Sequence, residues 1–187
     1  MIELVLVRHA KSDWGDPGLP DHERPLNARG TANAPTMARR LADTGITVDR
    51  IVSSTAVRAR TTAAAFGAAL GCEVELEPHL YDSSAKTLLE AAVAAGAGGG
   101  ADGTGGTGGT GGQGAPDVSG GAGGRVSPRT IMLVAHNPGI TDLASRLSAG
   151  GIAHMPTCAV ARFVWSTDEW CEAATRRPDS WGLDTVR

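Results

Sequence analysis

The 187-residue chain contains few aromatic side chains, few cysteines and no long apolar run. Phe, Trp and Tyr make up only 4% of it, so a hydrophobic core must consist mainly of Ala, Val, Leu and Ile. The three cysteines include no CxxC pair, which argues against a disulfide framework or a zinc ribbon and predicts reduced thiols. No stretch approaches the roughly 18 apolar residues that cross a bilayer.

The chain also lacks a strong charge of either sign. A formal net charge of −3 argues against broad binding to nucleic acid or to an anionic membrane, so any bound anion needs a local pocket. Glu3 interrupts the first apolar run, and Arg8 ends it early, so we expect no signal peptide and a cytoplasmic protein. The length fits one domain spanning residues 1–187.

Apolar runs alternate with segments of helical periodicity, which predicts an α/β fold of three layers, α/β/α, around a mostly parallel, doubly wound sheet. Pro35 fits only in the first turn of its helix. Ser54-Thr55 and Asn137-Pro138 have the chemistry of helix starts. The expected strands are 2–8, 49–53, 73–77, 130–135 and 159–165, and the expected helices are 31–43, 56–70, 85–95 and 137–148.

A glycine-rich tract separates two of these segments. Sixteen of the 26 glycines lie between residues 96 and 124, with almost no large apolar side chain among them. Such a composition cannot offset the entropy cost of ordering, so we expect a disordered insertion at about 96–125 within the single domain. The tract lacks the GxxxxGK[ST] pattern of a phosphate-binding loop. A flexible linker is therefore the favoured interpretation, and a partner-binding segment is the alternative.

Polar clusters follow three of the predicted strands directly. Arg8-His9 ends the first strand, Arg58 lies in the first turn after the second, and His136 follows the strand 130–135. The carboxyl ends of parallel strands converge at one edge of a sheet, where ligands bind. Two arginines, two histidines and two helix N-termini would then surround one anion such as a phosphoryl group. Taken singly, each of these residues has a structural interpretation, such as a surface ion pair, and only the joint pattern favours a site.

These residues resemble the histidine phosphatase superfamily, also called the phosphoglycerate mutase-like superfamily. The resemblance rests on Arg8-His9-Ala10, on the segment 53–61 (SSTAVRART) and on the segment 136–139 (HNPG). The segment 24–30 (RPLNARG) is similar to the small SixA-like branch of phosphohistidine phosphatases. The chain departs from the family at Ala10, where glycine is commonest.

The resemblance implies a phosphoglycerate mutase-like fold and a role for each matched residue. His9 would be the nucleophile and form a phosphohistidine intermediate, while Arg8 and Arg58 would bind the phosphoryl oxygens. His136 would donate to an equatorial oxygen in the transition state. No metal and no cofactor is expected, since arginines supply the positive charge that phosphoryl transfer requires.

The general acid is the least determined part of the predicted site. The family often carries an acidic residue after its third strand, and Asp82 lies near that place, although a helix cap is its structural alternative. Asp16, Asp21 and Glu23 in the first loop compete with it. Lys11 could add positive charge for substrate binding, or it could be a solvated surface charge.

A metal-independent phosphatase acting on a phosphoprotein, phosphohistidine in particular, or on a small phosphoester is the favoured function. The chain has no large lid insertion, so we expect an open site and no mutase activity. A phosphate-binding module without turnover is the alternative, and a metallohydrolase using His9, Asp13, Asp16 and His136 is weaker because its spacing matches no metal motif. We expect a monomer.

Overall fold

A single sheet organises the computed structural model, which describes residues 1–98 and 127–186. Its six strands run in the order β3-β2-β4-β1-β5-β6. The first four are mutually parallel, whereas β5 is antiparallel to β1 and β6 is antiparallel to β5. The prediction of a mostly parallel sheet is confirmed. The strands are β1 (Ile2–Arg8), β2 (Arg50–Ser53), β3 (Val74–Leu76), β4 (Thr130–Ala135), β5 (Val160–Trp165) and β6 (Ser180–Asp184).

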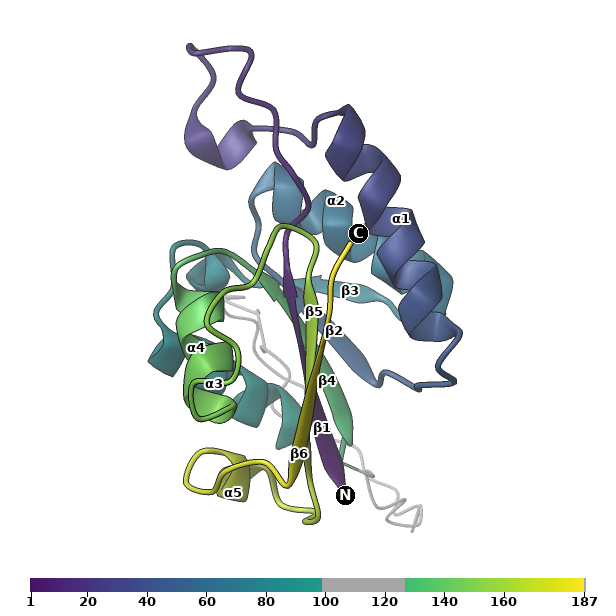
Figure 1. Ribbon diagram of the computed structural model, residues 1–187, viewed down its shortest axis with the longest axis vertical. Helices are drawn as coiled ribbons and strands as arrows, with labels where there is room; N and C mark the ends of the chain where they lie inside the picture. The colour runs from purple at the N-terminus through teal and green to yellow at the C-terminus, as the bar shows by residue number, and fades with distance from the viewer. Residues whose placement is uncertain (99–126, 187) are drawn as a thin grey trace, which may run out of the picture.

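Helices cover both faces of the sheet and complete three layers (Figure 1). One face carries α1 (Ala28–Ala42) and α2 (Val57–Leu70), and the other carries α3 (Ala85–Gly96), α4 (Gly139–Leu147) and the short α5 (Trp170–Ala173). Two 3-10 turns, η1 (Asp21–Glu23) and η2 (Pro78–Leu80), lie in the connections.

The strand β1 divides the apolar core into two halves. Successive side chains of a strand point to opposite faces. Accordingly Leu4 and Leu6 pack with the α3 and α4 side, while Val5 and Val7 pack with the α1 and α2 side. Every residue of β4 is buried, as the unbroken apolar run predicts for a central strand. The strand β4 is therefore buried along its whole length, up to the point where His136 follows it.

The first helix begins earlier than the sequence predicts. The Asn27 side chain accepts a hydrogen bond from Gly30 N and fixes the start of α1 at Ala28 instead of residue 31. Pro35 consequently lies inside the helix, so the expectation of a first-turn proline was wrong. Pro35 is exposed, on the side where a carbonyl that loses its intrahelical partner can reach water.

Two predicted helix starts also differ in detail. Ala56 occupies the N-cap position of α2 and offers no side-chain cap, while Ser54 Oγ accepts a hydrogen bond from Ala56 N. Pro138 is the N-cap residue of α4 and not its first helical residue. Ser54 therefore stabilises the turn before α2 without being its N-cap residue. Pro138 is the N-cap residue of α4, where the sequence predicts the first helical position.

Some expectations concern the chain as a whole. Strand β6 has no counterpart in the sequence prediction, which stopped at residue 165.

All three cysteines are free thiols. In the described part of the chain, no helix is long and apolar enough to cross a membrane. Most of the glycine-rich tract lies outside the described residues, so its predicted disorder stays a prediction.

Candidate active site

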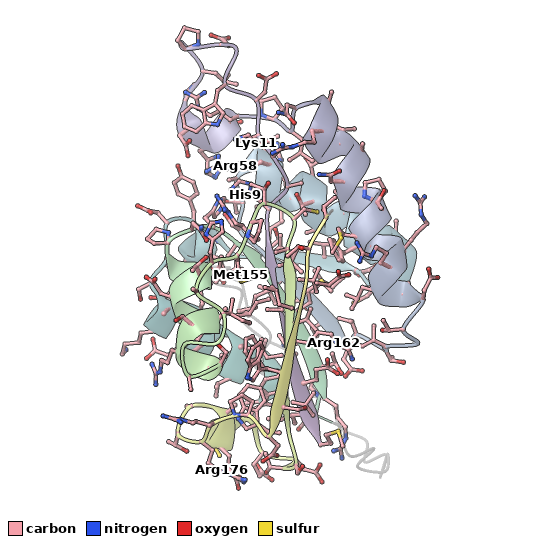
Figure 2. The ribbon with its side chains drawn as sticks, in the orientation of Figure 1. His9, Lys11, Arg58, Met155, Arg162 and Arg176 are labelled. Atoms are coloured by element: carbon pink, nitrogen blue, oxygen red, sulfur yellow. The ribbon has the colours of Figure 1, made fainter. Side chains whose placement is uncertain are left out.

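Three polar clusters meet at the carboxyl edge of the parallel strands, as the sequence predicts. The strands β2, β4 and β1 are adjacent in the sheet, and the segments that leave them carry Arg58, His136 and His9. Arg58 Nε lies 3.4 Å from His9 Nε2, and the ring centroids of His9 and His136 are 4.9 Å apart. Figure 2 shows His9 and Arg58 together at this edge.

The hydrogen bonds of His9 determine which ring nitrogen can react. His9 Nδ1 lies 2.7 Å from the carbonyl oxygen of Ala10, which can only accept, so Nδ1 carries the proton. Nε2 then keeps its lone pair, and Arg58 Nε donates toward it. Burial, reinforced by the positive charges of Arg58 and Arg8, lowers the pKa of His9 to about 4 although the Ala10 contact opposes this. His9 is thus a neutral imidazole at neutral pH, and the lone pair on its Nε2 faces the Arg58 guanidinium.

A buried threonine ties the His9 turn to α2. Thr62 Oγ1 donates to the carbonyl oxygen of Arg58 at 2.7 Å and accepts from Ala10 N at 3.0 Å. Because the Ala10 carbonyl orients His9, this bridge links the position of the imidazole to the helix that carries Arg58. The turn after β1 tolerates Ala10 in a fully buried position.

Arg8 and Arg58 bring two guanidinium groups to the site in different states. Arg8 donates through one terminal nitrogen to the Met155 carbonyl at 2.8 Å, and its buried Nε has no partner among the described residues. Burial lowers the pKa of Arg8 from its usual value. Arg58 already donates from every nitrogen, to His9 and twice to Asp21. Three of its five N–H groups are thus engaged, so a phosphoryl group that binds Arg58 competes with Asp21 for the guanidinium.

His136 completes the set as a second neutral imidazole. Its Nε2 lies 2.8 Å from Ser54 Oγ, and its buried Nδ1 has no partner in the described chain. Burial, together with the neighbouring His9 and Arg58, lowers the pKa of His136 to about 3. The ring of Tyr81 meets it edge-on, with centroids 5.4 Å apart.

Asp21 is the carboxylate that the structure brings to the site. Its Oδ2 accepts from Arg58 at 2.7 Å and from the Tyr81 hydroxyl at 2.8 Å. Partial burial acts to raise the pKa of Asp21, but the hydrogen bonds from Tyr81 and Arg58 outweigh it and lower the pKa. Sequence reasoning considered Asp21 only as a competing acid and missed Tyr81, since neither residue belongs to a periodic segment.

The other predicted residues lie farther from these contacts. Asp82 is exposed, with a φ of 50°, and no hydrogen bond of its carboxylate is found among the described residues. Nor does it cap a helix, because Ser84 caps α3. Lys11 is half-buried and lies at the same edge as His9 in Figure 2. Glu23 pairs with His22, and Asp16 accepts from Gly18 N within its own loop.

The described residues contain no group of three or more His, Cys, Asp or Glu side chains arranged to hold a metal ion. His9 and His136 face each other, while Asp13 and Asp16 bond to backbone groups of their own loop. The side chains named for a metallohydrolase are thus not gathered into one cluster.

Comparison with known proteins gives three findings. The model of the histidine phosphatase superfamily (branch 1) matches residues 4–89. A chloroplastic protein of Arabidopsis thaliana is 32% identical over 182 residues, which cover 97% of this chain and 75% of the relative. Two solved structures under 25% identity share the fold.

The first of these structures is the protein histidine phosphatase SixA with tungstate, with a TM-score of 0.67, 16% identity and coverage of 98% of this chain and 95% of that one. The second is mycobacterial glucosyl-3-phosphoglycerate phosphatase, with a TM-score of 0.57, 19% identity and coverage of 98% and 97%.

Proposed function

Since the chain belongs to the histidine phosphatase superfamily, we propose that it hydrolyses phosphorylated substrates through a phosphohistidine intermediate on His9. The observation that carries this proposal is the state of His9. Its Nδ1 is committed to the Ala10 carbonyl, its pKa is lowered to about 4, and Nε2 points toward Arg58. A neutral, oriented imidazole beside a guanidinium group is what nucleophilic attack on a phosphoryl group requires.

The reaction divides into two transfers. In the first, the lone pair of His9 Nε2 forms a bond to phosphorus while the bond from phosphorus to the leaving group breaks. In the second, water attacks the phosphohistidine, the N–P bond breaks, and inorganic phosphate forms. Arg8 and Arg58 would hold the phosphoryl oxygens in both steps, and His136 would donate a hydrogen bond to an equatorial oxygen.

The leaving group needs a proton, and the group available to supply it helps to decide which class of substrate fits the site. Asp21 contacts Arg58 and Tyr81, but its lowered pKa keeps it ionised at neutral pH. Asp82 stays a possible acid by sequence alone, and the exposed position of its side chain offers no support. A phosphohistidine substrate depends least on a strong acid because its nitrogen leaves readily once protonated. We therefore favour a phosphohistidine-bearing protein over a phosphoester with a poor leaving group.

A phosphate-binding module without turnover is the second candidate, and the coupling of Arg58 to Asp21 is the feature that would suit it. The presence of both neutral histidines favours the phosphatase instead. Lys11 would contribute to substrate binding from the edge of the site. A cytoplasmic location, a monomeric state and a single domain over residues 1–187 remain our predictions from the sequence.

The decisive experiment compares wild type with His9→Ala on a phosphohistidine protein and on para-nitrophenyl phosphate. His79→Ala, at an exposed position that makes none of the site contacts described above, serves as the matched control. We expect acid-labile phosphate on His9 in wild type and His79→Ala, and neither label nor turnover in His9→Ala. Full hydrolysis by His9→Ala would refute the proposal. Tight phosphate binding without turnover of either substrate would instead support the binding module.

A further inference from the structure

Ser54 is a buried hydroxyl that contacts the second histidine of the site. It lies between β2 and α2 with no exposed surface, and its Oγ is 2.8 Å from His136 Nε2. The same Oγ accepts a hydrogen bond from Ala56 N at 3.3 Å. Ser54 therefore joins the start of α2 to the residue that follows β4.

The direction of the serine–histidine hydrogen bond follows from counting protons. A neutral imidazole carries one N–H, and a serine hydroxyl carries one proton and can accept others. If His136 Nε2 donated to Ser54, the hydroxyl proton would need another acceptor, and the described residues provide none. If Ser54 donates to Nε2, its proton is used and its lone pair accepts from Ala56 N. The second arrangement leaves only His136 Nδ1 without a partner among the described residues, whereas the first would also leave the hydroxyl proton unpaired.

This arrangement places the ring proton of His136 on Nδ1. That atom is buried and has no partner among the described residues, so its N–H is available to a ligand. A phosphoryl group attacked by His9 develops negative charge on its equatorial oxygens, which an N–H stabilises. The opposite tautomer would turn a lone pair toward those oxygens and repel them.

We propose that Ser54 is a positioning residue that holds His136 in its Nδ1–H tautomer, ready to donate to the transferring phosphoryl group. The proposal rests on the proposed function for its effect on rate, but the tautomer itself is a property of the unliganded protein. Ser53 offers a matched control. It is equally buried, and its Oγ donates to the Ser54 carbonyl at 3.0 Å without reaching either histidine.

The first measurement is the ¹⁵N spectrum of the histidine rings of wild type at pH 7, with His136 assigned by the signals missing from His136→Gln. Protonated and unprotonated ring nitrogens resonate at well-separated frequencies. We expect the proton on Nδ1 of His136. A proton on Nε2 would overturn the proposal, whatever the enzyme does, and this measurement depends on no Ser54 variant being stable.

The second measurement compares Ser54→Ala with Ser53→Ala. In Ser54→Ala we expect a mixture of His136 tautomers and a kcat lowered about tenfold or more with little change in KM, since the loss falls on a transition-state contact. Ser53→Ala should keep the wild-type spectrum and kcat. An unchanged spectrum and kcat in Ser54→Ala, or equal losses in both variants at equal thermal stability, would contradict the positioning role. If wild type itself hydrolyses nothing, the phosphatase proposal fails while the spectra still decide the tautomer.

Discussion

At the scale of single residues, the site depends on hydrogen bonds that Arg58 and His9 already make within the protein. Each of the three Arg58 nitrogens donates a hydrogen bond, one to His9 and two to Asp21. His9 Nδ1 donates to the Ala10 carbonyl. These commitments leave His9 Nε2 reactive and hold Arg58 against it. The His9 imidazole is therefore oriented before any substrate arrives, which removes part of the entropy cost of reaching the transition state.

Replacing Arg58 by lysine tests whether its shape matters beyond its charge. A lysine keeps the positive charge but offers one ammonium in place of the planar fork that reaches His9 and an anion together. We expect Arg58→Lys to lower kcat/KM about a hundredfold, measured by steady-state hydrolysis. Arg60→Lys, on the exposed side of the same helix, is the control and should retain wild-type kinetics. A near-normal rate in Arg58→Lys would show that charge alone suffices.

At the scale of elements, the connection between β1 and α1 supplies a carboxylate that contacts Arg58. It carries η1, and Asp21 at the start of that turn occupies the guanidinium of Arg58. His22 in the same turn lies 2.9 Å from Thr55 Oγ1 and meets the Tyr81 ring edge-on. These contacts tie the loop to the segments that follow β2 and β3.

Removing the charge of Asp21 should ease the entry of an anion. Phosphate and the Asp21 carboxylate compete for the Arg58 guanidinium, and a neutral amide competes less well for it. We expect Asp21→Asn to lower the inhibition constant of inorganic phosphate about threefold to tenfold. Asp16→Asn is the comparison, since the Asp16 carboxylate lies on the same loop and accepts from Gly18 N. An inhibition constant that stays at the wild-type value would show that the Asp21 contact does not compete with the ligand.

The start of α4 packs against backbone and leaves no room for a side chain. A Cβ on Gly139 would lie 1.9 Å from the Ser83 carbonyl oxygen, and backbone cannot give way as a side chain can. Gly139→Ala should therefore destabilise the fold by about 2 kcal/mol in urea unfolding. Gly182→Ala in β6, where no atom lies within 4 Å of the new Cβ, should unfold close to wild type. Equal midpoints for the two variants would contradict this account of the packing.

The sequence predicts the strand ends of the site well because burial and polarity change abruptly there. The runs before Arg8 and His136 are apolar apart from Glu3 and Thr130, so the polar residues that follow them stand out. Loops carry no such periodic signal, and this is why the contacts of Asp21 and Tyr81 were not predicted. The early start of α1 depends on one side-chain hydrogen bond from Gly30 to Asn27, which propensity alone does not reveal.

At the scale of the whole molecule, two buried neutral histidines make global stability depend on pH. Both have ordinary pKa values near 6.5 when the chain is unfolded, against about 4 for His9 and about 3 for His136 when folded. The unfolded chain therefore binds more protons below pH 6.5, and stability declines as the pH falls from there toward the folded values.

We accordingly expect the thermal midpoint to drop between pH 7 and pH 5. His9→Gln, which cannot titrate, should show a smaller drop in the same scanning calorimetry series. The lowered pKa of Asp21 adds a further loss only at more acidic pH, below the ordinary carboxyl value. An identical pH dependence in wild type and His9→Gln would contradict the assignment of this effect to the site.

The single-domain prediction can be tested by shortening the glycine-rich tract. Replacing residues 99–126 with about ten Gly and Ser residues should leave the unfolding midpoint and the phosphatase kinetics unchanged, because the tract contains almost no apolar side chain to contribute to a core. Thermal unfolding and steady-state kinetics are the measurements. A shortened chain that unfolds earlier or loses turnover would assign the tract a role that its composition does not suggest.

The placement of β1 in the sheet determines when a newly made chain can acquire this chemistry. Arg8 and His9 are synthesised first, yet among the described strands β1 pairs with β4 and β5 alone, with Glu3 opposite Thr130 and Ile2 opposite Trp165. Contacts so distant in sequence cannot form until both partners exist. A translation product that stops before residue 130 carries the nucleophile and the Arg58 helix but has no central strand to bring them together. Its Arg8 and His9 would belong to an unpaired hydrophobic segment, a target for chaperones instead of a phosphate site.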